Sequence, residues 1–107
     1  MGFASGSAVL TARGRAVLDA VARCLRANRT AGRFEVGGHT DGEGNSGANL
    51  QLSVLRAQAA AAYLRARGVA PDRLEPRGYG ESQPVARDDT PAGRAANRRI
   101  SFRPLPR

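Results

Sequence analysis

The sequence has 107 residues, with 17 arginines and no lysine, 9 acidic residues and one histidine, which gives a formal charge of +8 at neutral pH. This length is typical of a single domain with one modest core. The composition excludes a collagen, a coiled coil and a disordered tail. The longest apolar run, residues 59–64, is far shorter than the roughly 20 residues that cross a bilayer.

Redox and metal chemistry find little support in the composition. Cys24 is the single cysteine and cannot form an internal disulfide, and together with His39 it falls short of the four ligands of a closed zinc site. We therefore expect neither a metal nor a cofactor. The positive charge favours an anionic partner, such as nucleic acid, a membrane surface or an acidic polymer, without choosing among them.

The first half of the chain predicts a strand stub, a helix and a strand. Phe3 is the stub of the first strand. A helix with its N-cap at Thr11 ends at residues 28–32. Alternating side chains then predict a strand over residues 33–38. The expected core positions of the helix recur at three- and four-residue steps and are Val17, Leu18, Val21, Cys24 and Leu25.

The second half predicts a long helix, an edge strand, a short helix and a last strand. The long helix begins after a cap at Asn45 or Ser46 and ends at Arg67, with Gly68 in a left-handed C-terminal position. Pro76 predicts that the strand over residues 74–79 lies at a sheet edge, since proline cannot donate to a ladder. The expected core stripe of the long helix is Leu52, Leu55, Ala59, Ala62, Tyr63 and Ala66.

Thr90 and Pro91 form an N-cap and first turn for the short helix, which runs to about Ala96. Residues 98–103 alternate, with Ile100 and Phe102 pointing inward. The alternation of strands and helices predicts an α/β fold, a two-layer sandwich with helices on one face of a small mixed sheet. Residues 1–107 form one domain, which we expect to be a part of a longer protein.

Residues 42–47 match the glycine pattern of a dinucleotide-binding loop, but the match is rejected. Asp41 and Glu43 place two carboxylates where a pyrophosphate would lie. A calcium-binding EF-hand also fails, because its twelfth loop position is Leu52 and not a glutamate. No phosphate-binding lysine loop or nucleophile elbow is present. With one histidine and no matching nucleophile, we expect no enzyme.

Three polar residues of the long helix, Asn49, Ser53 and Arg56, are spaced i, i+4 and i+7 and share a half-buried stripe. An arginine there needs an acceptor, and Asp41 is one candidate. Two interpretations remain open. Asp41 and Arg56 form a surface salt bridge, or they flank a gap and bind a zwitterion, with the aspartate taking an ammonium and the arginine a carboxylate.

Several ordered motifs between Phe3 and Phe102 carry a resemblance to a known family. They are Phe3…Ser7…Leu10, Gly38-His39-Thr40-Asp41, Asn49-Leu50-Gln51-Leu52-Ser53-Val54-Leu55-Arg56-Ala57, Tyr63-Leu64, Gly78-Tyr79-Gly80-Glu81…Pro84 and Gly93-Arg94-Ala95…Asn97-Arg98-Arg99-Ile100. Together they resemble the OmpA-like C-terminal domain, the peptidoglycan-binding module also found in the Pal lipoprotein and the MotB stator protein.

The resemblance implies a non-catalytic periplasmic module, associated with the outer membrane, that anchors an envelope protein to the cell wall. Its partner would be the meso-diaminopimelate residue of the peptidoglycan stem peptide. Asp41 and Arg56 match the principal ligands, Asn49 and Arg98 belong to the same pocket, and Thr40 contributes. His39 is expected to be a packed residue at a strand end. The resemblance involves no nucleic acid, and membrane attachment would come only from an upstream anchor.

The sequence departs from the family in two places. Gly37 stands where many relatives carry an acidic or polar residue, and the first strand is nearly absent, so that Ser5 or Ser7 would supply any contact from the first loop. A homodimer stays open. The alternative functions are a basic nucleic-acid-binding module, which scattered arginines and few aromatic residues disfavour, and a cell-wall enzyme, which would need a catalytic carboxylate pair or a metal site.

Overall fold

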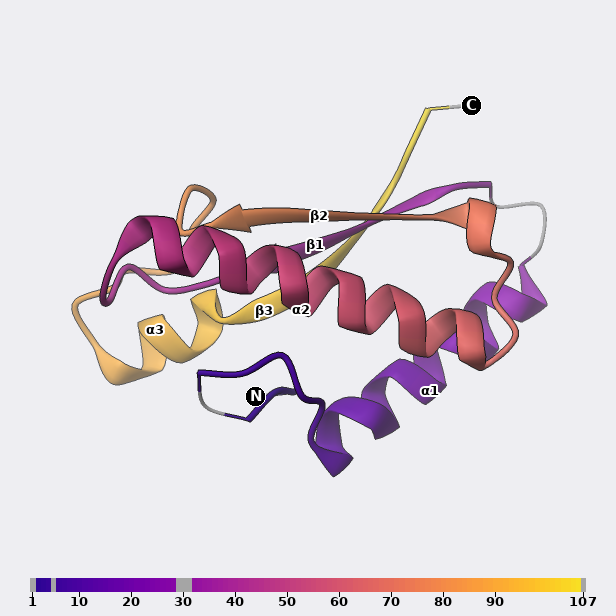
Figure 1. Ribbon diagram of the computed structural model, residues 1–107, viewed down its shortest axis with the longest axis horizontal. Helices are drawn as coiled ribbons and strands as arrows, with labels where there is room; N and C mark the ends of the chain where they lie inside the picture. Colours follow the sequence, from indigo (N-terminus) through magenta and orange to yellow (C-terminus); the bar gives the residue numbers. More distant parts are fainter. Residues whose placement is uncertain (1, 5, 29–31, 107) are drawn as a thin grey trace.

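The computed structural model describes residues 2–4, 6–28 and 32–106. Its elements are α1 (Ala12–Ala27), β1 (Phe34–His39), α2 (Ser46–Ala66), a 3₁₀ turn (Pro71–Arg73), β2 (Leu74–Gly80), α3 (Pro91–Asn97) and β3 (Arg99–Pro104). Figure 1 shows α1 and α2 beside the sheet and the short α3 at one end. The predicted order is confirmed for all of these elements.

The expected first strand is the exception. Phe3 forms only an isolated antiparallel bridge with Leu10. The amide of Ala4 donates to the carbonyl of Val9, and the amide of Thr11 donates to that of Gly2. The beginning of the chain therefore pairs with its own following loop, and Phe3 is buried there instead of extending the sheet.

The sheet has three strands among the described residues, in the order β2-β1-β3. β1 runs parallel to β2 and antiparallel to β3, so the sheet is mixed, as predicted. β2 lies at an edge, as Pro76 predicts. The core between the helices and the sheet contains Leu18, Ala22, Leu25, Val36, Ala60, Ala61, Leu64, Val69 and Leu74, with Ile100 and Phe102 packed against it.

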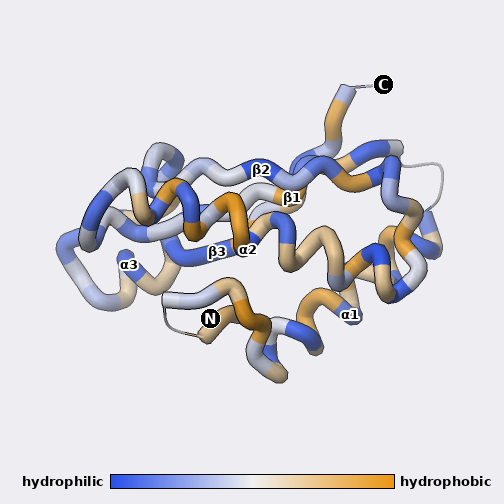
Figure 2. Tube along the Cα trace, viewed as in Figure 1, coloured by the Kyte–Doolittle hydropathy of each residue, from blue (hydrophilic) through white to orange (hydrophobic). Residues whose placement is uncertain are grey.

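The expected core stripe of α2 is wrong at three of its six positions, although Tyr63 packs against the core as expected. Leu55 is 53% exposed, and Ala62 and Ala66 are exposed as well. Leu52, Ala59 and Tyr63 are only half-buried. The buried face consists of smaller and more polar residues, namely Ser53, Arg56, Ala57, Ala60, Ala61 and Leu64. The hydropathy tube shows polar and apolar colours mixed along α2 (Figure 2). Residues 59–64 are apolar without a break, so hydropathy alone does not identify the buried side of the helix.

Two paired glycines explain why small residues of α2 face the sheet. Gly38 and Gly78 are opposite each other on β1 and β2. A Cβ atom on Gly38 would lie 2.1 Å from the carbonyl oxygen of Ser53, and one on Gly78 would lie 2.6 Å from the amide nitrogen of Val54. The helix backbone therefore packs directly on the strand backbone, with no room for leucine between them.

The expected buried face of α1 is also only partly right. Leu18 and Leu25 are buried as expected, together with Gly14 and Ala22. Val17 is 58% exposed and Cys24 is exposed, while Val21 is half-buried and packs against the core. A Cβ atom on Gly14 would lie 2.1 Å from the carbonyl oxygen of Gly2, so the first residues of the chain occupy part of this face.

The helix boundaries follow the predicted caps. The side chains of Thr11, Asn45 and Thr90 accept hydrogen bonds from backbone amides in the first turns of α1, α2 and α3. Gly68 has a φ of 95° directly after α2, as expected for a left-handed C-terminal position. Within the described ranges, no helix combines the length and apolar character that crossing a membrane requires.

Candidate functional site

All five residues expected in the ligand site line one open hollow of about 610 Å³ at the carboxyl end of β1. Three elements bring them together: the loop after β1, the first turns of α2 and the end of α3. The parallel strand β1 delivers its last residues to the same edge of the sheet at which α2 begins. The five residues are Thr40, Asp41, Asn49, Arg56 and Arg98, and the other lining residues are Phe3, Gly6, Glu43 and Leu52.

The Asp41 side chain is only 11% exposed and both of its oxygens accept hydrogen bonds. Oδ1 accepts from the Glu43 amide at 3.0 Å, and Oδ2 accepts from the Arg98 guanidinium at 2.5 Å. Burial by itself would raise the pKa of the Asp41 carboxyl. The hydrogen bonds and the positive charges of Arg98 and Arg94 outweigh burial, and the pKa is lowered. Asp41 is therefore a carboxylate at neutral pH.

Arg56 is buried and contacts the first residues of the chain. Its Nε donates to the Ser7 carbonyl oxygen at 2.9 Å, and its guanidinium lies 5.2 Å from the centre of the Phe3 ring. Burial and repulsion by Arg98 lower the pKa of Arg56, while the negative charge of Asp41 opposes this. The salt-bridge interpretation for Asp41 and Arg56 is therefore wrong, since the ion-pair partner of Asp41 is Arg98.

Asn49 and Thr40 have different roles in the wall of the hollow. The Asn49 side-chain amide donates to the Glu43 carbonyl oxygen at 2.7 Å and so ties the loop to α2. Thr40 is buried and its backbone amide donates to Gly80. Within the described part of the chain its hydroxyl has no hydrogen-bond partner. The loop and the helix thus hold each other in place around the hollow.

A second ion pair lies beside the hollow and was not predicted from the sequence. Glu43 lies two residues after Asp41 and pairs with Arg94 at 2.8 Å. Arg94 lies four residues before Arg98, so both arginines project from one side at the end of α3. Two loop carboxylates are therefore each paired with an α3 arginine. The four-residue spacing of Arg94 and Arg98 was the feature of the sequence that could have indicated the second pair.

Ser7 contributes to the site through its backbone carbonyl, while Ser5 lies outside the described residues. The expectation that His39 is packed is confirmed, because the residue is 2% exposed and stacks on Tyr79 with ring centroids 5.3 Å apart. Its Nε2 hydrogen-bonds with the Ser101 hydroxyl at 2.8 Å. Burial, helped by Arg99, lowers the pKa of His39 to about 4.

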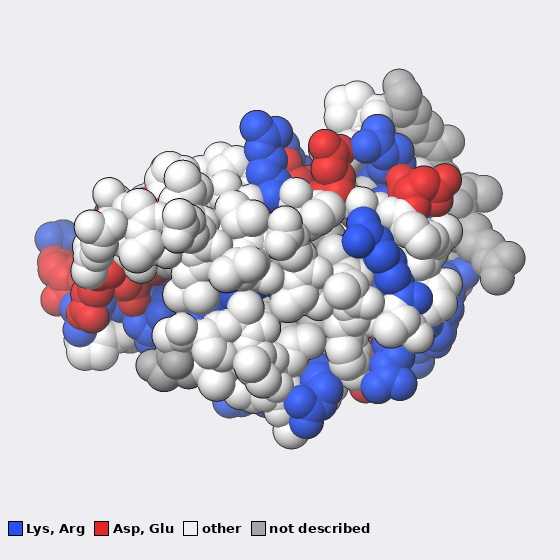
Figure 3. All heavy atoms as spheres, viewed as in Figure 1, with Lys and Arg blue, Asp and Glu red and all other residues white. Residues whose placement is uncertain are grey.

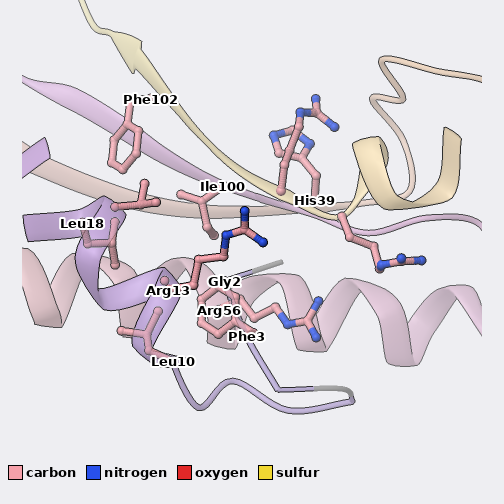
Figure 4. Close-up of a pocket in the computed structure, with 13 residues that line it drawn as sticks. Gly2, Phe3, Leu10, Arg13, Leu18, His39, Arg56, Ile100 and Phe102 are labelled. Carbon is pink, nitrogen blue, oxygen red and sulfur yellow. The ribbon is translucent and has the colours of Figure 1, made fainter. Parts of the chain in front are cut away.

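A second, mostly apolar cavity of about 280 Å³ adjoins the hollow and shares Phe3, Arg56 and Arg98 with it. Figure 4 shows Phe3 and Arg56 side by side, with Ile100 and Phe102 contributed by β3. The stacked pair of Phe3 and Arg56 forms part of the wall of both spaces. The wall therefore depends on how the first residues of the chain pack.

The charges of the surface are distributed unevenly. Figure 3 shows arginines at several separate places on one face and a group of acidic atoms at the end of the molecule near α3. In the parts of the chain that the structure describes, no three histidine, cysteine, aspartate or glutamate residues are grouped so that they could hold a metal ion. The charged side chains that line the hollow are two carboxylates, Asp41 and Glu43, and two guanidiniums, Arg56 and Arg98.

The fold and this hollow define a small α/β ligand-binding domain. The chain belongs to the OmpA family, whose sequence model matches residues 2–98. The peptidoglycan-binding protein ArfA of Mycobacterium tuberculosis is 41% identical to it over 100 residues. That match covers 94% of this chain and 30% of ArfA, so the chain spans about a third of the length of that relative.

The solved structures that are similar to this chain include the following two. The peptidoglycan-associated lipoprotein of Burkholderia pseudomallei has a TM-score of 0.81 at 30% identity, over 96% of this chain and 85% of that one. The C-terminal domain of Helicobacter pylori MotB has a TM-score of 0.86 at 22% identity, over 94% and 79%. The α/β fold predicted from the order of strands and helices is therefore confirmed.

Proposed function

We propose that this domain binds peptidoglycan without catalysis and holds the stem peptide by its meso-diaminopimelate residue, so that it anchors an envelope protein to the cell wall. One observation carries the proposal. The carboxylate of Asp41 and the guanidiniums of Arg56 and Arg98 line the same hollow. Opposite charges on its walls suit a ligand that itself carries both charges.

The amino-acid end of diaminopimelate carries an ammonium and a carboxylate a few bonds apart. Asp41 accepts the ammonium in this proposal. The Nε of Arg56 is bound to the Ser7 carbonyl, which leaves its two terminal nitrogens to donate to the ligand carboxylate as a planar fork. Asn49 and Thr40 supply uncharged hydrogen-bonding groups. Few contacts form with one such ligand, so repeated stems on the polymer supply avidity.

The relatives support the envelope setting of this proposal. One is named a peptidoglycan-binding protein and another is a peptidoglycan-associated lipoprotein. The domain would act in the periplasm, close to the outer membrane, as part of a longer protein whose upstream anchor contacts the membrane. The relatives lend no support to a nucleic-acid-binding module, the alternative that the charge of +8 left open.

Co-sedimentation with purified sacculi tests the proposal. We expect Asp41→Asn and Arg56→Met to lower the bound fraction at least tenfold. Methionine is chosen because Arg56 is buried, and alanine would also leave a cavity. The matched controls are Glu75→Gln and Arg33→Met, which break an exposed ion pair at the opposite end of β1 and should leave binding unchanged.

Full binding by both site variants, with thermal melting showing that they are folded, would refute the assignment of the hollow. Release of soluble muropeptides during the incubation would identify an enzyme instead. A gel shift with duplex DNA at 0.15 M salt covers the nucleic-acid alternative, and we expect no shift.

A further inference from the structure

The carboxylate to which the proposed function assigns the ligand ammonium already holds a cation. Arg98 donates to Oδ2 of Asp41 at 2.5 Å, and the Glu43 amide occupies Oδ1. The Asp41 side chain is 11% exposed and that of Arg98 is 32% exposed. An ammonium that binds Oδ2 of Asp41 therefore has to compete with the Arg98 guanidinium for it.

The charges around the hollow do not balance. Arg56 and Arg98 contribute two positive charges, whereas Asp41 contributes one negative charge. The nearby carboxylate of Glu43 is neutralised by Arg94, at 2.8 Å. Burial is the main cause that lowers the pKa of Arg56, and repulsion by the positive charge of Arg98 adds to it. The hollow thus has an excess positive charge, which favours an anionic group and disfavours the entry of a bare cation.

Arg98 is placed so that its side chain can exchange partners without disturbing α3. Its backbone amide donates to the carbonyl oxygen of Arg94 and ends the helix. Only the side chain extends from this anchored position to Asp41. Displacing the guanidinium therefore requires rotation about side-chain bonds and no rearrangement of the helix.

We infer that Arg98 determines specificity by making the hollow select zwitterions over plain cations. An ammonium group binds Asp41 only by displacing the Arg98 guanidinium. Replacing the Arg98 guanidinium by an ammonium on the same carboxylate contributes little binding free energy by itself. It becomes favourable when the ligand also brings a carboxylate, which the displaced Arg98 and the neighbouring Arg56 bind together. This inference rests on the proposed function and concerns the same site.

The test compares three related probes. The first is meso-diaminopimelate, which carries ammonium and carboxylate groups. The second, pimelate, has the same seven-carbon chain with the carboxylates only, and the third, 1,5-diaminopentane, keeps the two ammonium groups without the carboxylates. Affinities are measured by calorimetry for the wild type and for Arg98→Gln. We expect the wild type to prefer diaminopimelate over the diamine by at least a hundredfold. In Arg98→Gln the diamine should bind about tenfold more tightly and pimelate more weakly, so the preference falls at least tenfold.

Three further variants identify the cause of any change. The double variant Asp41→Asn/Arg98→Gln should lose the gain in diamine affinity, because the uncovered carboxylate is gone. Arg98→Lys keeps a cation beside Asp41 and should keep most of the preference. Arg77→Gln removes an arginine from β2, outside the lining of the hollow, and should change nothing. Thermal melting confirms that each variant is folded.

An unchanged preference in Arg98→Gln would overturn the inference, as would a diamine gain that persists in the double variant. Sedimentation of the wild type with sacculi is measured in parallel. Bound sacculi together with an unchanged preference would refute only the role of Arg98. A wild type that binds no sacculi would refute the proposed function itself, whatever the three probes show.

Discussion

His39 makes the stability of the fold sensitive to mild acid over a defined pH range. The imidazole is buried on β1 between Tyr79, on which it stacks, and Ser101. Burial is the main cause that lowers its pKa from 6.5 to about 4; the charge of Arg99 adds to this, and Glu35 opposes it. The folded protein therefore holds His39 neutral under conditions in which the unfolded chain binds a proton.

The direction of the effect follows from which state binds the proton. Because the folded pKa is the lower one, the contribution of His39 to stability is present above pH 6.5 and is lost as the pH falls toward 4. The full difference corresponds to roughly 3 kcal/mol, of which about 2 kcal/mol is lost between pH 7 and pH 5.

Urea unfolding at pH 7 and pH 5 measures this loss in the wild type and in His39→Gln. The variant should lose about 2 kcal/mol less than the wild type over this interval. Carboxylates titrate in both proteins, so the difference between the two isolates the imidazole. His39 is the single histidine of the chain, and its NMR signal should titrate with a midpoint near 4. A midpoint near 6.5, or equal losses in both proteins, would refute the reasoning.

Two pairs of substitutions test the packing of α2 by chemical denaturation. Leu64→Ala removes a fully buried side chain and should cost about 2–5 kcal/mol, whereas Leu55→Ala, at a position 53% exposed, should cost less than about 1 kcal/mol. Gly38→Ala forces a methyl group against the backbone of α2 and should cost about 1–3 kcal/mol, while Gly47→Ala in its first turn should be neutral or slightly stabilising. Equal costs within either pair would contradict the observed packing.

Elements with strong local signals could be predicted from the sequence. Caps such as Thr11, Asn45 and Thr90 act within their own first turn, and Pro76 excludes a central strand wherever the rest of the chain lies. The prediction of a first strand was wrong because a single apolar residue, Phe3, cannot specify pairing with a distant strand. Phe3 pairs instead with the nearby Leu10.

The five residues expected in the site line one hollow, but the pairing among them could not be predicted. The family motifs contain these five, which are among the nine residues that line it. Their spacing left two alternatives for Asp41: a salt bridge with Arg56, or a gap between the two side chains that a ligand fills. The observed partner, Arg98, is 57 positions further along the chain. No local pattern encodes that contact, because it depends on where the end of α3 meets the loop after β1.

The amino-acid sequence by itself determined the order and limits of the helices and strands, since caps, turns and proline act over a few residues. The buried face of α2 was decided only by the tertiary structure. Alanine occurs on every side of this helix and gives no preferred direction. The close approach of its backbone to Gly38 and Gly78 selects the face with the smallest side chains, and it thereby turns Arg56 toward the hollow that Asp41 also lines.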